Sequence, residues 1–382
     1  MSDPIVIIGS GLAGISVARE LRKLDKDVPV VIVTADDGVY YSKPNLSNAL
    51  AAGKTAAQLA LTAAPQLASQ LGAEIRAHTR VERLLPAEHV LVTDHGRISY
   101  RKLVLALGAD PIRLPLQGDG AAEVLSVNNL PDYAGFRARL EGRKHVAILG
   151  AGLIGCEFAN DLRVAGIAVD VFDLEPQPLG RLLPTQAAGF LRDRLEAAGV
   201  RFHFATSIAQ VAREGAAYRL TDQHGDTHMT DLLLSAIGLK PSLALAQTGG
   251  LACGRGIITD QHLRTSAADI YALGDCAEVA GLLQPFVMPI MQAARVLAQT
   301  LASGDEVTLR YPAMPVVVKT PACPAVVCPP PATATGAWLE AVAADGVHAV
   351  FQDATGKPLG FALLGEAIKE KQALTGQMPA WL

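Results

Sequence analysis

The chain has 382 residues, half of them hydrophobic, so two or three domains with separate cores are expected. Its formal net charge of −4 at pH 7 gives no support for nucleic-acid binding or for a polybasic membrane surface. No run of about 18 apolar residues indicates a transmembrane span, and residues 1–4 lack the positive leader of a signal peptide.

Residues 5–14 (IVIIGSGLAG) predict a buried strand, a tight glycine turn and the start of a helix. Gly9 permits the sharp turn, Gly11 lets backbone approach a pyrophosphate, and Gly14 lets the helix pack on the strand. The unpaired N–H groups of a helix start favour phosphate. Alone, this pattern is only suggestive of a dinucleotide site.

A second buried strand is expected at residues 30–33, after a helix at 16–24. In the usual nucleotide fold an acidic residue at the end of this strand holds the adenosine ribose. Thr34 occupies that place here, with Asp36 just beyond it. Either Asp36 reaches back to the ribose, or another group does so and Asp36 belongs to a solvated turn.

Residues 40–47 (YYSKPNLS) are unusual for a plain surface loop, because two aromatic residues precede Lys43 and Pro44. Pro44 fixes its own backbone angle and biases Lys43 towards extended geometry. Lys43 is then either a solvent lysine or a cation held near an electron-rich cofactor. Beyond this loop we expect a helical stretch at 59–71 with a break before Pro65, strands at 74–77, 89–92 and 103–109, and a hairpin turn at 93–96.

The glycine pattern recurs at residues 146–155 (VAILGAGLIG), with Gly150, Gly152 and Gly155 in the three positions. Two such units in one chain imply two dinucleotides, which is a much stronger signal than one. A helix at 157–164 and a strand at 169–173 follow.

Asp173 occupies the strand end where the first unit has Thr34. A carboxylate there accepts hydrogen bonds from ribose hydroxyls and repels a 2′-phosphate. Arg181 is the nearest cation downstream, and no arginine cluster follows the strand. The second unit is therefore expected to prefer NADH to NADPH.

The remaining elements complete an α/β chain of two Rossmann-like three-layer nucleotide-binding domains, for FAD and NADH, and a small α+β C-terminal domain. The FAD domain is expected at 1–112 and 242–310, the NADH domain at 113–241, and the C-terminal domain at 311–382. The expected elements are a helix at 185–198, strands at 200–204, 217–221 and 231–236, a crossing at 238–241, and a proline-started helix within 285–300.

Three further segments are sequence motifs that occur together in a known family: residues 107–109 (LGA), 237–241 (IGLKP) and 270–275 (IYALGD). With the two nucleotide motifs they resemble the FAD-dependent pyridine-nucleotide reductases over essentially the whole chain. Within that group, residues 41–47 and the ending 360–365 (GFALLG) look like rubredoxin–NAD reductases of the alkane-oxidation type.

The resemblance implies roles for particular residues. Lys43 would lie beside flavin N5 and pair with Glu157, although Glu157 could also be a surface carboxylate near a helix start. Asp275 would accept a hydrogen bond from the ribityl chain, or would simply cap a turn. The cofactor-binding residues expected are Gly9, Gly11, Gly14, Asp36, Lys43, Pro44, Gly108, Gly150, Gly152, Gly155, Asp173, Gly238, Asp275, Pro289, Ile290 and Lys319, with the helix start at Pro289 and Ile290 facing the flavin N1/O2 edge.

The cysteines separate this chain from the disulfide reductases, since none precedes Cys156 and no Cys-x-x-Cys occurs. Their odd number predicts reduced thiols in the cytoplasm, and their spacing predicts no metal centre. Cys323 and Cys328 are expected to be free packed thiols.

The resemblance therefore implies an NADH-dependent oxidoreductase that passes electrons through FAD to rubredoxin and supports an oxygenase such as alkane hydroxylase. The alternatives are a ferredoxin reductase, or a nucleotide-sensing flavoprotein that acts by binding a partner. Rubredoxins are generally acidic, so a local basic patch is expected. Its candidates are Lys319, Lys43 and Arg295.

Overall fold

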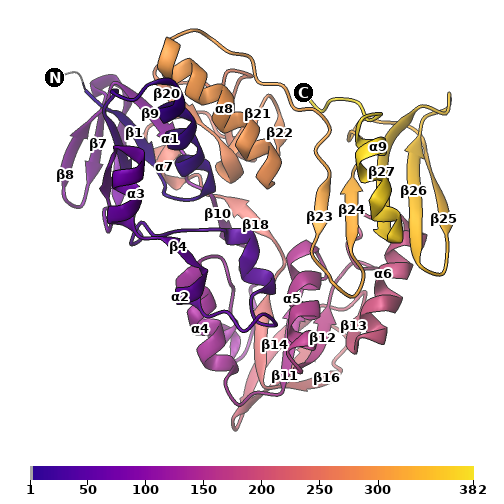
Figure 1. Ribbon diagram of the computed structural model, residues 1–382. Coiled ribbons are helices and arrows are strands. Elements are labelled where there is room, and N and C mark those ends of the chain that lie inside the picture. Colours follow the sequence, from indigo (N-terminus) through magenta and orange to yellow (C-terminus); the bar gives the residue numbers. More distant parts are fainter. Residues whose placement is uncertain (1–2) are drawn as a thin grey trace.

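The computed structural model describes residues 3–382 and is built on three main sheets, two parallel and one antiparallel, each in its own unit beside smaller sheets (Figure 1). The first sheet has the order β20-β9-β1-β2-β5, and all its pairs are parallel. Its strands are β1 (Ile5–Ile8), β2 (Val30–Val33), β5 (Glu74–Arg76), β9 (Lys102–Leu105) and β20 (Ile270–Ala272). Because β20 comes from late in the chain, this unit is discontinuous in sequence.

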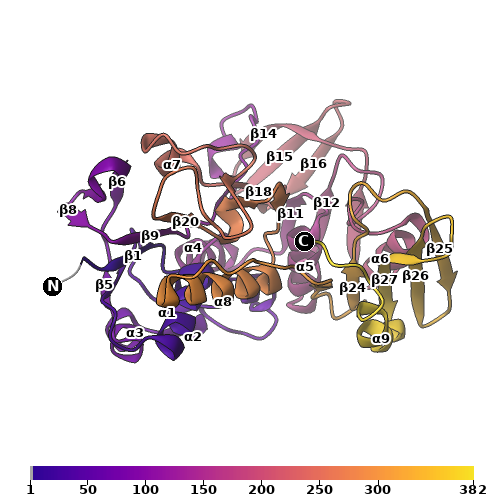
Figure 2. The ribbon, with the colours of Figure 1, turned by 90° about the horizontal axis from the view of Figure 1, so that it is seen from above.

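The strands at the centre of this sheet are buried on both faces, as parallel strands usually are. All four residues of β1 and of β2 are buried, and Ile7 pairs with Ile32 on one side and Val104 on the other. Helices α1 (Leu12–Leu24) and α8 (Val287–Ser303) pack together against the sheet and lie side by side in both views (Figures 1 and 2). The unit also contains α2 (Ala56–Leu59), α3 (Ala64–Leu71), α7 (Ala244–Thr248), β3 (Tyr40–Tyr41), β4 (Ala60–Thr62), β6 (Val81–Leu85), β7 (Val90–Thr93), β8 (Gly96–Ser99), β19 (Ile257–Thr259), β21 (Ala277–Val279) and β22 (Leu282–Leu283).

The second unit repeats the plan with a parallel sheet of order β13-β12-β11-β17. A separate antiparallel sheet, β14-β15-β16, packs on it through a small apolar cluster that includes Phe172 and Val211. Its elements are α4 (Leu130–Leu140), β11 (His145–Leu149), α5 (Leu153–Val164), β12 (Ala168–Phe172), α6 (Thr185–Ala197), β13 (Val200–His203), β14 (Ile208–Glu214), β15 (Ala217–Asp222), β16 (Thr227–Thr230) and β17 (Leu232–Ser235).

Two short strands join the first two units. Strand β10 (Ala109–Pro111) pairs antiparallel with β18 (Leu239–Pro241), so the outgoing and returning crossings lie side by side. Strand β18 lies within the crossing expected at residues 238–241, and the domain limits stay a prediction.

The third unit is a five-stranded antiparallel sheet of order β23-β24-β27-β26-β25. Helix α6 of the second unit packs against β25, β26 and β27, so the β-rich terminal domain is not isolated. Trp381 donates its backbone N–H to the carbonyl of Tyr311 at 2.7 Å, which returns the chain end to the start of this unit. Its elements are β23 (Val316–Val318), β24 (Ala325–Cys328), β25 (Ala337–Val342), β26 (Gly346–Gln352), β27 (Pro358–Gly365) and α9 (Lys371–Thr375).

Some expected elements differ from the structure for identifiable reasons. The strand expected at 103–109 is two strands, because Gly108 has a φ of +71° and bends the chain between β9 and β10. The helix expected at 59–71 is divided by β4, and α3 starts only where Pro65 can occupy its first turn. Strands β6, β14 and β16 were not anticipated, since their largely exposed residues give little apolar signal. No helix within residues 3–382 is both long and apolar enough to cross a membrane.

Candidate functional site

The first glycine loop has the geometry of a phosphate cradle. Gly9 has a φ of +113°, and a Cβ on it would overlap the carbonyl oxygen of Ala106. A Cβ on Gly14 would overlap the carbonyl of Gly9, so the helix and the strand approach too closely for any side chain. Gly11 differs, because nothing lies within 4 Å of the position its Cβ would take. The open space at the start of α1 is where a phosphate group would fit.

Three segments far apart in sequence converge beside this cradle. Gly274 has a φ of +78°, and a Cβ there would lie 2.9 Å from Ala13 Cβ and 3.9 Å from Ile290 Cγ1. The residue before Asp275, the first turn of α1 and the first turn of α8 therefore meet at one place. Pro289 and Ile290 are buried in that first turn, so the helix start is brought to the cradle as expected, while its role towards a flavin stays a prediction.

Lys43 and Asp275 are near enough for each charge to shift the pKa of the other. Burial raises the pKa of Asp275, and the nearby Lys43 ammonium opposes that shift. Burial also lowers the pKa of Lys43, opposed by Asp275 first and then by Asp110 and Asp132. Each group therefore stabilises the charged form of the other in a desolvated setting. Lys43 and Pro44 begin a 3₁₀ helix, Lys43–Asn48, that follows β3.

Asp36 lies at the surface just beyond β2. Its backbone N–H donates to Thr34 Oγ1 at 3.3 Å, and the buried Thr34 hydroxyl also accepts from Ser10 Oγ at 3.1 Å. Within residues 3–382 the carboxylate of Asp36 forms no hydrogen bond or ion pair. Both interpretations of Asp36 therefore stay open.

The second glycine loop repeats the first. Gly150 has a φ of +108°, and a Cβ on it would lie 2.7 Å from the carbonyl oxygen of Ala236. A Cβ on Gly155 would overlap the carbonyl of Gly150, whereas the space around Gly152 is open. Gly108 and Gly238, both at positive φ, lie at the chain crossings that follow β9 and β17.

Asp173 follows β12 directly and lies beside this second loop. Its carboxylate accepts hydrogen bonds from the backbone N–H of Ala151 and, at 2.8 Å, from that of Glu175. Arg181 is almost fully exposed and lies 4.0 Å from Glu175, so it faces a carboxylate rather than extending a basic cluster. The surroundings are acidic, as a ribose with a free 2′-hydroxyl requires.

Glu157 is the most deeply buried carboxylate at the junction of the three units, with 1% exposure. It lies on α5, five residues after Gly152, and accepts a hydrogen bond from Ser47 Oγ of the first unit. The third unit supplies Lys319, whose backbone N–H donates to Glu157 Oε1 at 2.9 Å and whose Nζ lies 3.0 Å from Oε2. One carboxylate thus joins all three units.

The ammonium of Lys319 is surrounded by oxygen atoms of the 3₁₀ helix as well. It donates to the carbonyl of Pro44 and lies 3.3 Å from Ser47 Oγ. With the Asn48 amide oriented to satisfy both of its ends, its oxygen accepts from Lys319 Nζ at 3.2 Å. A charged group held by several oxygens in this way has little freedom to move.

The rest of the same face of α5 completes the junction. The carboxylate of Asp161 accepts from the backbone N–H groups of Leu50 and Ala51 at 2.9 and 3.0 Å. The amide oxygen of Asn160 accepts from the N–H of Ala322 at 3.0 Å. Helix α5, which begins at the second glycine loop, therefore binds backbone of both neighbouring units.

The structure corrects the expected partner of Glu157. The carboxylate pairs with Lys319, whereas the carboxylate that most raises the pKa of Lys43 is Asp275. The reason is that β23 ends directly over α5, so both the backbone and the side chain of Lys319 reach the carboxylate. Ser47, Asn48, Asn160 and Asp161 were not anticipated as junction residues. Polar side chains at spacings of three and four on an otherwise apolar helix were the available signal for the last two.

The cysteines do not form a redox or metal site. All five are free, and no group of three or more His, Cys, Asp or Glu residues able to hold a metal occurs in residues 3–382. Burial raises the pKa of Cys276 and of Cys328 to about 12, and that of Cys323 to about 11. These thiols stay protonated near neutral pH.

Residues 3–305 match the family described as pyridine nucleotide-disulphide oxidoreductase. The chain belongs to that family. Residues 308–378 match the family described as rubredoxin binding C-terminal domain. The chain is therefore an oxidoreductase that uses FAD and NADH. Its two glycine loops have room for two dinucleotides.

Relatives of known function resemble the chain along its whole length. It is 47% identical to the rubredoxin-NAD(+) reductase of Alcanivorax borkumensis, over 99% of both chains. It is 36% identical to the nitric oxide reductase FlRd-NAD(+) reductase of Vibrio vulnificus, over 97% of this chain and 96% of the other. Among solved structures, the ferredoxin reductase of Rhodopseudomonas palustris has a TM-score of 0.89 at 25% identity, covering 99% and 96% of the two chains. NADH:rubredoxin oxidoreductase from Clostridium acetobutylicum, at 20% identity and a TM-score of 0.81, shares the fold.

Proposed function

We propose that this chain is an NADH-dependent FAD flavoprotein that reduces rubredoxin, and that the rubredoxin supports an oxygenase such as alkane hydroxylase. The observation that carries the proposal is the placement of Lys319. Lys319 directly follows β23 and lies within the region that matches the rubredoxin-binding domain. Its ammonium pairs with Glu157, which lies near the start of α5, the helix that follows the second glycine loop. The region that matches a rubredoxin-binding domain is thus part of the same junction as the nucleotide sites.

Each residue set has a task in this proposal. The open positions at Gly11 and Gly152 admit the two pyrophosphates, and Asp173 holds the ribose of NADH. Lys43 and Asp275 hold a fixed pair of charges beside the flavin site. When bound, the flavin accepts two electrons together and releases them one at a time. Glu157 and Lys319 fix the three units relative to one another, so that both dinucleotides are oriented at the junction.

No thiol is suited to relay the electrons. Four of the five thiols are buried, and burial raises the pKa of all five. A protonated thiol does not attack a disulfide, and an unpaired thiol is already reduced, so it cannot accept an electron pair. The electrons are therefore proposed to leave directly to a protein whose metal centre docks close to the flavin.

The test is to load the purified protein with FAD and to measure NADH-driven reduction of rubredoxin and of a ferredoxin in parallel. We expect kcat/KM for rubredoxin to exceed that for ferredoxin by at least about tenfold, a difference of about 1.4 kcal/mol. A higher kcat/KM for ferredoxin than for rubredoxin would support the ferredoxin-reductase alternative. The structural likeness to the Rhodopseudomonas palustris ferredoxin reductase is the reason to test it. A long-lived reduced complex with no turnover would support the nucleotide-sensing alternative, and a protein that binds no flavin would exclude all three.

The proposal also covers location and domain limits. All five cysteines are free, which suits the cytoplasm. The FAD domain comprises 1–112 and 242–310, the NADH domain 113–241 and the C-terminal domain 311–382. Residues 1 and 2 of the first range lie outside the described part of the chain. The paired strands β10 and β18 support the two inner limits.

A further inference from the structure

We infer that an acidic rubredoxin docks over the exposed side of helices α1 and α8. The partner is the acceptor of the proposed function, so the docking surface rests on that proposal. We call this surface the α1/α8 face and define it by Arg19, Lys23, Met288, Met291 and Arg295.

The first argument is that the C-terminal domain, which contains the rubredoxin-binding match, has no net positive charge of its own. Residues 311–382 contain four Lys or Arg and five Asp or Glu, so the domain is not basic. Its one lysine near the flavin side, Lys319, is already neutralised by Glu157. Electrostatic attraction must therefore come from a neighbouring surface.

The second argument concerns two of the three cations expected to form the basic patch. Lys319 is enclosed by oxygens, and Lys43 lies with Asp275 in the desolvated flavin region. Neither is free to meet a partner. Arg295 is exposed and has no carboxylate within 4 Å in the described chain, so it is the only one of the three suited to docking.

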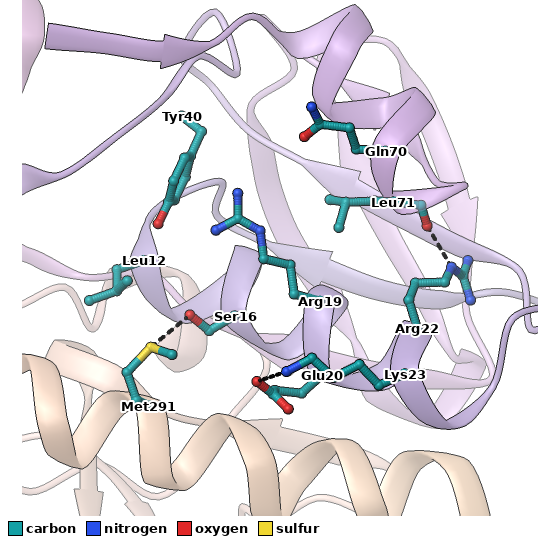
Figure 3. Close-up of a pocket in the computed structure, with 10 residues that line it drawn as sticks. All are labelled: Leu12, Ser16, Arg19, Glu20, Arg22, Lys23, Tyr40, Gln70, Leu71 and Met291. Carbon is teal, nitrogen blue, oxygen red and sulfur yellow. Dashed lines mark hydrogen bonds and ion pairs between the residues drawn. The ribbon is translucent and has the colours of Figure 1, made fainter.

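The third argument is a cavity over α1, with Tyr40 and α3 on one side and Met291 of α8 on the other (Figure 3). It has a volume of about 400 Å³, and its α1 lining includes Leu12, Ser16, three basic residues and Glu20. Leu12 follows Gly11 directly, and Met291 follows Ile290. The cavity therefore opens beside the segments that fit the flavin.

The charges that line this cavity are only partly compensated. The guanidinium of Arg19 lies over the Tyr40 ring, 4.3 Å from its centroid, and Arg22 donates to the carbonyls of Leu71 and Gly72. Neither has a carboxylate within 4 Å among residues 3–382. Lys23 pairs with Glu20 at 2.7 Å, so this pair adds no net charge. The α1/α8 face thus keeps an excess of positive charge.

Apolar side chains accompany these charges. The side chain of Met288 is 56% exposed at the start of α8 and that of Val287 is 41% exposed. Met291 lies one turn before Arg295 on the same side of the helix, and its sulfur accepts a weak hydrogen bond from Ser16 Oγ at 3.2 Å. Flexible methionines next to fixed cations suit a surface that must bind a partner briefly and release it. A partner seated here has its metal centre next to the helix starts that meet the flavin.

The test uses the FAD-loaded protein with NADH and purified rubredoxin. In Arg295→Glu and Arg19→Glu we expect kcat/KM for rubredoxin to fall by about three- to tenfold at about 20 mM salt, and the difference to shrink at about 300 mM. The matched control is Arg83→Glu, an exposed arginine of β6 with no side-chain partner in residues 3–382, on the separate β6-β7-β8 sheet. Flavin reduction by NADH, followed without any acceptor, should be unchanged in all three variants.

Two outcomes would overturn the inference in different ways. If the unaltered protein reduces rubredoxin and both variants match Arg83→Glu at low salt, the docking surface is wrong while the proposed function stands. If the unaltered protein reduces no rubredoxin, both proposals fail together. Because Arg295 is fully on the surface, its variant keeps the test valid even if Arg19→Glu disturbs packing on Tyr40.

Discussion

The carboxylate of Glu157 and the ammonium of Lys319 lie 3.0 Å apart, although 162 positions separate them in the chain and they belong to different units of the fold. Glu157 is 1% exposed and Lys319 about one third exposed, so one partner is fully desolvated and the other is partly in water. Removing the partner of a buried charge costs much more than removing an exposed charge.

Replacing Lys319 should therefore destabilise the junction. We expect Lys319→Met to lower the free energy of unfolding of the apoprotein by about 2–3 kcal/mol, less than for a fully buried pair because water reaches the ammonium. The control is Lys357→Met, which removes an exposed lysine of the same unit. It should change the free energy of unfolding by less than about 0.5 kcal/mol. The double variant with Glu157→Gln should cost less than the sum of the two single variants; strict additivity would show that the pair is not coupled.

Lys43 should act on the reaction more than on the fold. We expect Lys43→Met to slow flavin reduction by NADH about tenfold or more in stopped-flow measurements, because a fixed positive charge beside the flavin site is lost. Lys54→Met, at an exposed lysine nearby, should leave the rate unchanged. An unchanged rate in Lys43→Met itself would remove Lys43 from the catalytic residues.

The two glycines of the first cradle should respond differently to alanine. Gly11→Ala adds a methyl group to open space at a φ of −75°, so the apoprotein should keep its Tm while its affinity for FAD falls about tenfold or more. Gly14→Ala forces a methyl group onto the Gly9 carbonyl and should lower the Tm of the apoprotein itself. Thermal unfolding without FAD and titration with FAD separate the two effects. Unchanged FAD affinity in Gly11→Ala would show that the pyrophosphate lies elsewhere.

Asp173 should set the choice of nicotinamide cofactor. Its carboxylate is fixed by the N–H of Ala151, so Asp173→Asn removes the negative charge while an amide oxygen can still accept that bond. We expect KM for NADH to rise several-fold. The ratio of kcat/KM for NADH to kcat/KM for NADPH should fall about tenfold. Asp193→Asn, an exposed change on α6, is the control. Higher catalytic efficiency with NADPH than with NADH in the unaltered protein would contradict the assignment.

A buried charge away from the cofactors should govern acid stability. Burial alone would raise the pKa of Asp170, but hydrogen bonds from Arg201, His145 and His203 hold it well below its usual range. The stability that Asp170 contributes is therefore complete above its unfolded pKa near 4 and is lost as the pH falls below that value. Asp170→Asn should lower the free energy of unfolding at pH 7 by about 2–4 kcal/mol and flatten its dependence on pH between about 4 and 2. Denaturant unfolding measured across that range checks both effects, and an equally steep dependence in the variant would contradict them.

Local signals were sufficient for the two nucleotide-binding units. The runs of residues 5–14 and 146–155 each predict strand, turn and helix from neighbouring residues, and the structure has all three in both places. The positive φ of Gly9 and Gly150, like the close approach at Gly14 and Gly155, follows from local geometry that only glycine allows. Strand β14, which was missed, pairs with the next strand β15 but has mostly exposed residues, so it leaves a weak apolar pattern in the sequence.

By itself the sequence determined the family, the two dinucleotide cradles and the acidic end of β12, because each depends on residues close together in the chain. It did not determine the partner of Glu157: the family resemblance implied Lys43, and the structure pairs the carboxylate with Lys319. Only the tertiary structure brought the end of β23 over helix α5 and left Arg19 and Arg295 without carboxylate partners among residues 3–382. Pairing across domains depends on how whole units pack, and no spacing along the chain records that packing.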